Sequence, residues 1–400
     1  MVADVPTTPA GQRIVLSRAA LGAIAVTFLL MGTLASAYGP MLELLTRRFG
    51  IGLPVAGEVL SVHFAGALTG VVVWMRMLER VSGRLAVAAA LAVTGLGCAG
   101  AAAAPSWPAF LVAVFMVGIG FGALDIALTQ LVAHSEGQRR SALLNALSGA
   151  YAVGAVAGPI LVSVAGGRRL SLLYAGGAAL AFILIPAAAR VSGRLTAPSA
   201  GDVAKRTTGR GGLIVIFVVA FVLYVGVETG TSGWMASHLE SVGFGSVAAA
   251  TLTSGFWLAL ALGRLLVALV PPTVPEPAIV LAGTAVAAGA LLAAVYGPAA
   301  PVAYIVTGLG VAPIWPTAVV WLARLNPGDA RATSWLFPAA MAGGALVPGG
   351  ISLVVARSGV GWVPAILAAV ALGCLAAFAL AATRAGRVLS EAAGSRSSGA

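Results

Sequence analysis

Twelve long apolar segments, each separated from the next by a short polar or Pro/Gly-containing break, constrain this 400-residue chain more than any other feature. A helix needs roughly 20 mostly apolar residues to cross a bilayer. Segments of about that length lie at 19–45, 55–77, 85–104, 109–133, 141–166, 170–189, 213–239, 247–270, 277–296, 301–323, 330–356 and 360–383. The pattern predicts an all-α integral membrane protein of about twelve transmembrane helices, placed in the cell membrane and surrounded by lipid.

Charge is scarce, which agrees with this interpretation. Only 9% of the residues are charged and the mean hydropathy is +1.02, whereas soluble domains carry roughly 25% charged residues. The net charge of +11 comes from short scattered basic clusters, so no nucleic-acid partner is expected. Cys98 and Cys374 both lie in apolar segments and suggest neither a disulfide framework nor a metal site, and we expect no cofactor.

The order of polar and apolar segments predicts five parts. Residues 1–18 form a polar N-terminal tail, and the apolar run after it is too long for a cleavable signal peptide. Two six-helix bundles are expected at 19–190 and 213–384. A basic, Gly- and Ser-containing linker at 191–212 joins them, and 385–400 form a C-terminal tail.

The distribution of basic residues predicts the orientation, because loops on the cytoplasmic side are enriched in Lys and Arg. With the N-terminus inside, 18 of the 23 Lys and Arg residues fall on inner segments. The outer segments hold Arg47, Arg48, Arg168, Arg169 and Arg357. We therefore expect both termini in the cytoplasm.

The two halves resemble each other in their small residues. Four positions are matched 190 residues later: Gly118 by Gly308, Gly120 by Gly310, Gly154 by Gly344, and Gly158 by Pro348. These matches indicate a duplicated six-helix unit.

Two short motifs resemble the major facilitator superfamily of transporters. The segment 78–84, with Glu79, Arg80 and Arg84, is similar to the acidic-Arg-x-Gly-Arg loop of that family, and Gly154-x-x-x-Gly158-Pro159 is similar to its Gly-x-x-x-Gly-Pro element. The resemblance implies two six-helix bundles and gating contacts from Glu79, Arg80, Arg84 and Arg264. Gly154, Gly158 and Pro159 are expected to let a neighbouring helix approach closely.

Further segments resemble the fucose-permease-like sugar transporters within that superfamily. They are 118–125, ending in Asp125; 144–151, with Asn145; and 224–228, ending in Glu228 and followed by Trp234. The resemblance implies that the solute is sugar-like.

Asp125 and Glu228 lie well inside the fourth and seventh spans. An ionisable group at membrane depth costs roughly 2.5–3.5 kcal/mol, so it is a functional candidate by default. In the superfamily fold, helices 1, 4, 7 and 10 line the central cavity, and the two carboxyl groups would face it from opposite halves. Desolvation there favours the protonated form, which a proton carrier needs. Alternatively, Asp125 pairs with Gln130 or Asn145, and Glu228 bonds the side of Tyr224 or Trp234.

The tenth span contains Pro313 and Pro316 on either side of Trp315. Two prolines at this spacing are expected to break the helix where it lines a cavity. Trp315 then offers a flat face for a sugar or aromatic ring, although a simple packing kink is the alternative. The predicted substrate-binding residues are Glu228, Trp315, Tyr224, Trp234, Asn145 and Tyr38.

Other classes of protein fit less well. Lys205 is the chain's one lysine and does not belong to a phosphate-binding Gly-Lys-Ser/Thr loop, so an ATP-driven pump is not expected. Residues 230–233 match an intramembrane serine protease motif, but His238 follows in the same span, so we expect no enzyme. The function predicted is proton-linked secondary transport of a small polar, sugar-like solute by a monomer. Drug or metabolite efflux in exchange for protons is the alternative, and a channel is a more distant one.

Overall fold

The structure, a computed structural model, describes residues 18–77, 81–133, 140–165, 170–188, 211–267, 269–271, 273–326 and 330–397, and these residues form helices and turns without strands. The first half holds α1 (Arg18–Phe49), α2 (Leu53–Met77), α3 (Gly83–Ala103), α4 (Trp107–Ala133), α5 (Arg140–Ala165) and α6 (Leu170–Ala188). The second half holds α7 (Gly211–Ser241), α8 (Ser246–Val267), α9 (Glu276–Ala294), η2 (Gly297–Ala299), α10 (Ala300–Val311), α11 (Ile314–Leu325), α12 (Ala330–Ser334), α13 (Leu336–Ser358), η3 (Val360–Trp362) and α14 (Val363–Ser397).

Twelve helical segments of the described chain are long and apolar enough to cross a membrane, which confirms the predicted fold class. The tenth span consists of α10 and α11, separated by a turn at Ala312 and Pro313. The first span continues beyond its predicted end at residue 45 as far as Phe49. Arg48 in this last turn donates to the carbonyl oxygens of Ala102 (3.3 Å) and Ala104 (3.1 Å), so the extra turn is held against the end of α3.

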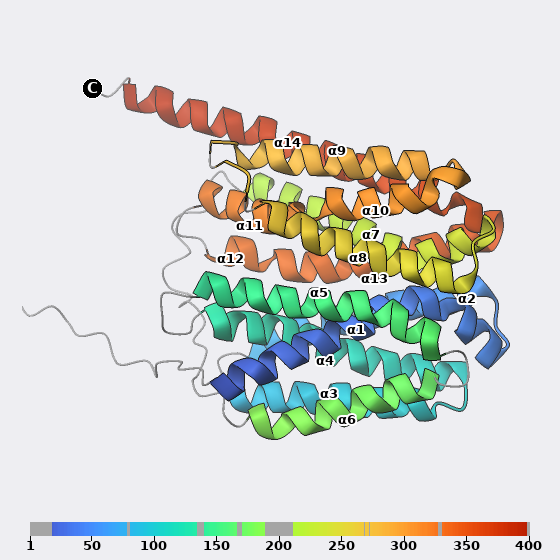
Figure 1. Ribbon diagram of the computed structural model, residues 1–400. Coiled ribbons are helices and arrows are strands. Elements are labelled where there is room, and N and C mark those ends of the chain that lie inside the picture. The colour runs from blue at the N-terminus through green and yellow to red at the C-terminus, as the bar shows by residue number, and fades with distance from the viewer. Residues whose placement is uncertain are drawn as a thin grey trace, which may run out of the picture.

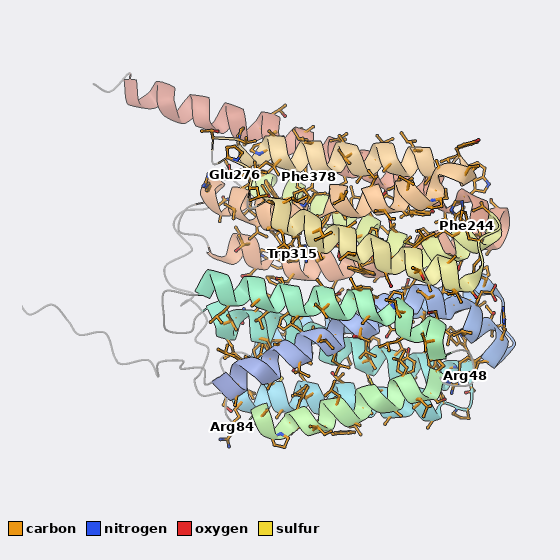
Figure 2. All side chains as sticks on the ribbon, in the orientation of Figure 1. Arg48, Arg84, Phe244, Glu276, Trp315 and Phe378 are labelled. Carbon is orange, nitrogen blue, oxygen red and sulfur yellow. The ribbon has the colours of Figure 1, made fainter. Side chains whose placement is uncertain are left out.

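The two halves lie side by side with their helices roughly along one direction (Figure 1). Helix α1 begins and α14 ends at the same end of the bundle, which we call the terminal side; the opposite end is the far side. Figure 2 shows Arg84 and Glu276 near the terminal side and Arg48 and Phe244 near the far side. Between the halves, α2 packs on α13, α5 on α8 and α1 on α7.

The repeat seen in the sequence corresponds to equivalent packing in the two halves. A Cβ atom on Gly118 of α4 would lie 2.0 Å from the His63 carbonyl oxygen of α2, and one on Gly308 of α10 would lie 2.5 Å from the Phe256 carbonyl oxygen of α8. Gly120 meets α3 in the same way that Gly310 meets α9. The glycines thus permit α4 and α10 to approach their neighbours at backbone distance.

The predicted match between Gly154 and Gly344 is wrong by one residue. Gly154 approaches the Leu29 carbonyl of α1, and in the second half it is Gly343 that approaches the corresponding helix, α7, at the Val222 carbonyl. Gly344 instead lies against the Phe64 ring of α2 and serves the contact between the halves. Adjacent glycines at 343 and 344 hide this shift in the sequence.

On the far side, the halves are sealed by backbone contact. A Cβ atom on Gly39 of α1 would lie 2.2 Å from the Ser232 carbonyl oxygen of α7. Two further glycines lie at the contact between the halves. Gly57 of α2 lies against the indole ring of Trp234, and Gly233 of α7 lies against Leu60. Since no side chain separates the backbones of α1 and α7 here, little space is left for a solute at this end.

Candidate functional site

A cavity of about 510 Å³ lies between the two halves. This volume suits a small organic ligand. Its walls are mostly aromatic and aliphatic, with a small set of polar groups. The lining residues are Phe28, Ala35, Leu60, Phe64, Phe121, Asp125, Thr129, Leu147, Ser148, Tyr151, Val225, Glu228, Thr229, Ser232, Trp257, Arg264, Trp315, Pro316, Val319, Thr333, Phe337, Ala340 and Met341.

Helical spacing brings the polar groups to the cavity. Phe121, Asp125 and Thr129 follow one another at four-residue intervals, so they share one face of α4. Trp257 and Arg264 are seven residues apart and share one face of α8. The lining therefore includes α2, α5, α8 and α13 as well as the predicted helices of spans 1, 4, 7 and 10.

On the wall of the second half, Glu228 is held by its own helix. The Tyr224 hydroxyl, one turn earlier on α7, donates to Glu228 Oε2 at 2.6 Å. The guanidinium of Arg264 is close enough to interact electrostatically with Tyr224, Glu228 and Tyr151. Glu228 thus lines the cavity as predicted and also makes the Tyr224 contact that was the alternative to a functional role.

On the wall of the first half, Asp125 lines the cavity from α4. Within the described part of the chain, it makes no hydrogen bond and no ion pair, although it interacts electrostatically with Tyr151. Its suggested partner Gln130 accepts a hydrogen bond from Trp74 Nε1 at 3.2 Å. The other suggested partner, Asn145, is on α5, and its side chain is outside the described residues.

The break in the tenth span faces the cavity. Trp315 and Pro316, at the start of α11, both line it. The Trp315 ring lies 5.3 Å from that of Phe221 and 5.7 Å from that of Phe337, between centroids. These neighbours hold the indole in place at the cavity wall.

Three other predicted substrate contacts lie outside the lining. Tyr224 is buried behind Glu228. Trp234 is fully buried in the far-side contact, and Tyr38 is fully buried with its hydroxyl 3.1 Å from His63 Nδ1. A role for them in substrate binding stays a prediction.

The predicted gating residues are divided. Glu79 and Arg80 are outside the described residues. Arg84 is exposed at the start of α3 on the terminal side (Figure 2), whereas Arg264 lines the cavity. Their gating role remains a prediction.

The Gly154, Gly158 and Pro159 element lies where α5 meets α1. A Cβ atom on Gly154 would be 2.0 Å from the Leu29 carbonyl oxygen, and one on Gly158 would be 2.2 Å from Ser36 Oγ. Pro159 is buried inside α5. The two helices can approach this closely because Gly154 and Gly158 have no side chains.

Sequence reasoning missed Tyr151 and Trp257 as cavity residues. Their rings meet edge to face where the two halves meet, with centroids 6.3 Å apart. The spacing of Trp257 and Arg264 could have indicated this face of α8, because residues seven apart in a helix lie on the same side and a charged residue inside a span is a functional candidate.

The protease interpretation finds no support in the geometry. Ser232 Oγ donates to the carbonyl oxygen of Thr229 (3.3 Å), and His238 Nδ1 is 2.9 Å from the Tyr304 hydroxyl. The two side chains are therefore engaged with different partners.

Comparison with known proteins identifies the family. The family model described as "Major Facilitator Superfamily" matches residues 24–305, and the chain belongs to this family. No curated protein matches the sequence significantly. The chain is a transporter of this class by family and fold.

Solved structures share the fold at low sequence identity. A D323A mutant of the nucleoside transporter NupG is 14% identical with a TM-score of 0.71, covering 91% of this chain and all of that one. The peptide transporter POT in complex with sulfate is 14% identical (TM-score 0.75, 92% and 95% covered). A D-xylose-proton symporter is 16% identical (TM-score 0.70, 90% and 96% covered).

Proposed function

We propose that this chain is a proton-linked secondary transporter that moves a small organic solute by alternating access. One observation carries the proposal: a cavity between the two halves has a carboxyl group on each wall, Asp125 from α4 and Glu228 from α7. Carboxyl groups at membrane depth are costly and rare, so two that line one cavity are candidates for carrying an ion or binding a solute. The family and the fold support secondary transport.

The two carboxyl groups have different surroundings and are assigned different roles. Asp125 carries the proton, since within the described residues no hydrogen bond or ion pair holds it in one charge state. Glu228 orients the solute, because Tyr224 fixes its carboxylate and Arg264 lies nearby. Trp315 contributes a ring face for the solute.

The conformation supports access from the terminal side. The far side is closed by the Gly39 contact between α1 and α7. Cavity residues such as Phe28, Thr333 and Phe337 belong to the terminal-side ends of their helices. With both termini in the cytoplasm, as the basic residues predict, the cavity faces inward.

The solute expected from the resemblance is small, polar and sugar-like, taken up together with a proton. A second candidate is efflux of a drug or metabolite in exchange for protons. The aromatic and aliphatic walls favour this second candidate, because they suit an amphipathic solute better than one covered in hydroxyl groups.

Transport in proteoliposomes with an imposed pH gradient tests the proposal. Radiolabelled D-xylose, uridine and glucuronate, none of which crosses a bilayer readily, are offered separately, with protein-free liposomes as the control. We expect at least one solute to accumulate inside above its outside concentration, or to be expelled below it. This difference in solute concentration should be lost when a protonophore is added. Equilibration of every solute without accumulation or expulsion would contradict proton linkage.

A further inference from the structure

We infer that the cavity takes a ring-bearing organic anion, whose carboxylate is bound by the face of α8 that carries Trp257 and Arg264. The inference rests on the proposed function and specifies its substrate class. It specifies the small polar solute expected from sequence as one that carries a negative charge.

Two hydrogen-bond donors on this face lack acceptors. Within the described part of the chain, Trp257 Nε1 and Arg264 Nε are buried and have no hydrogen-bond partner. The two residues are two helical turns apart, about 10 Å along α8, and both line the cavity. Since buried donors are almost always paired in native structures, two unpaired donors on one cavity wall point to a ligand that supplies acceptors.

The charges on this wall favour a negative ligand. Among the described residues, Arg264 makes no ion pair within 4.0 Å; it is hydrogen-bonded to Tyr224 and interacts electrostatically with Glu228, which itself accepts a hydrogen bond from Tyr224. The Nε edge of the guanidinium has no acceptor among the described residues, and an arginine can bind a carboxylate through this edge in a planar two-pronged contact. A cationic ligand would face Arg264 and leave both donors without acceptors.

The rest of the cavity suits a ring. Tyr151 faces Trp257 across the cavity wall, and Trp315 and Phe337 form an aromatic pair on the side of α11 and α13. A carboxylate bound at Arg264 would project its ring among these groups. A proton on Asp125 would then make the combined movement of anion and proton electrically neutral.

Ligand-induced thermal stabilisation of the purified protein in detergent, without any gradient, tests the inference. The probes are two matched pairs, benzoate with benzamide and glucuronate with glucose, together with benzylamine. We expect at least one acid to raise Tm, since a ligand that binds the folded state stabilises it. The neutral partner of that acid should need at least a tenfold higher concentration to give the same rise in Tm. Comparing the two pairs also tells whether the ring is aromatic or a sugar.

Variants locate the anion. Arg264→Gln should abolish the stabilisation, and Arg264→Lys should retain part of it because the charge stays while the planar fork is lost. Arg384→Gln is the control, because Arg384 is exposed on α14, outside the cavity lining. It should respond to the acid as the wild type does.

Two results would overturn the inference: neither acid is preferred over its neutral partner, or benzylamine stabilises more than benzoate. If Arg264→Gln does not fold, the wild-type probe series still decides. Because binding is measured without a gradient, a failure of proton coupling does not affect this outcome.

Discussion

Tyr224 and Arg264 distinguish the two carboxyl groups of the cavity. Glu228 accepts a hydrogen bond from Tyr224 and has the cation of Arg264 nearby. Among the described residues, Asp125 has an electrostatic interaction with Tyr151 but no hydrogen bond. The geometry therefore gives Glu228 fixed partners and leaves Asp125 without a hydrogen bond or an ion pair among the described residues.

Substitution at these two positions should separate proton coupling from substrate binding. Asp125→Asn imitates the protonated side chain, so we expect accumulation driven by a pH gradient to be lost while counterflow exchange of the same solute persists. Glu228→Gln should weaken accumulation and exchange together and lower the apparent affinity tenfold or more, because Tyr224 and Arg264 lose the charged partner that positions them and a lost hydrogen bond to a charged group costs about 1.5–3 kcal/mol. Accumulation by Asp125→Asn at the wild-type level would remove Asp125 from the coupling mechanism.

Much of the site was visible in the sequence at this scale. Asp125, Glu228 and Trp315 stand out because charged and Pro-flanked residues are rare inside apolar segments, and all three line the cavity. Tyr38 and Trp234 have the same residue types as real cavity residues, but they are buried elsewhere. Packing between helices decides which aromatic residues face the cavity, and the local pattern of residues along one sequence does not reveal that packing.

At the scale of helices, glycine determines how closely elements approach. The positions Gly118, Gly120, Gly308 and Gly310 predicted a duplication, and each lies where α4 or α10 meets a neighbour at backbone distance. The sequence pattern assigned this role to Gly344 instead of Gly343, since the two glycines are adjacent and either one fits the repeat. Helix number and breaks were predictable because they depend on local hydropathy and proline, whereas register depends on tertiary contacts.

Gly39 is expected to control closure of the far side. In Gly39→Val, the new side chain would clash with the α7 backbone at Ser232, so α1 and α7 should stay apart on that side. A cysteine introduced at Thr129, in the cavity lining, should then be labelled several-fold faster by an impermeant maleimide added outside cells. Gly22→Val is the matched control, because Gly22 is on the same helix and a Cβ atom added there would meet nothing within 4 Å. Equal labelling of the two variants would show that this contact does not close the pathway.

For the whole molecule, the distribution of charge predicts the orientation in the membrane. The start of α1 and the end of α14 share one side (Figure 1), as an even number of spans requires. Arg47, Arg48 and Arg357 lie at the far-side ends of α1 and α13. By the positive-inside rule, we predict that the terminal side faces the cytoplasm, because most of the Lys and Arg residues fall on the segments assigned to that side.

Cysteine labelling in intact cells tests this orientation. A cysteine at Ser358, exposed at the far-side end of α13, should react with an impermeant maleimide, whereas one at Ser82, before α3, should react only after the cells are opened. The native Cys98 and Cys374 are buried and should give little background. The reverse pattern would invert the topology and make the cavity outward-facing.

Coupling between solute and proton is the central claim, and proton movement driven by a solute gradient measures it most directly. Proteoliposomes that contain a pH-sensitive dye start with equal pH on both sides and a gradient of whichever solute the transport assay identifies. We predict that solute flow moves protons uphill and changes the internal pH, and that a protonophore abolishes the change. Solute flow at the same rate with no change in internal pH would contradict the claim and leave the protein a uniporter.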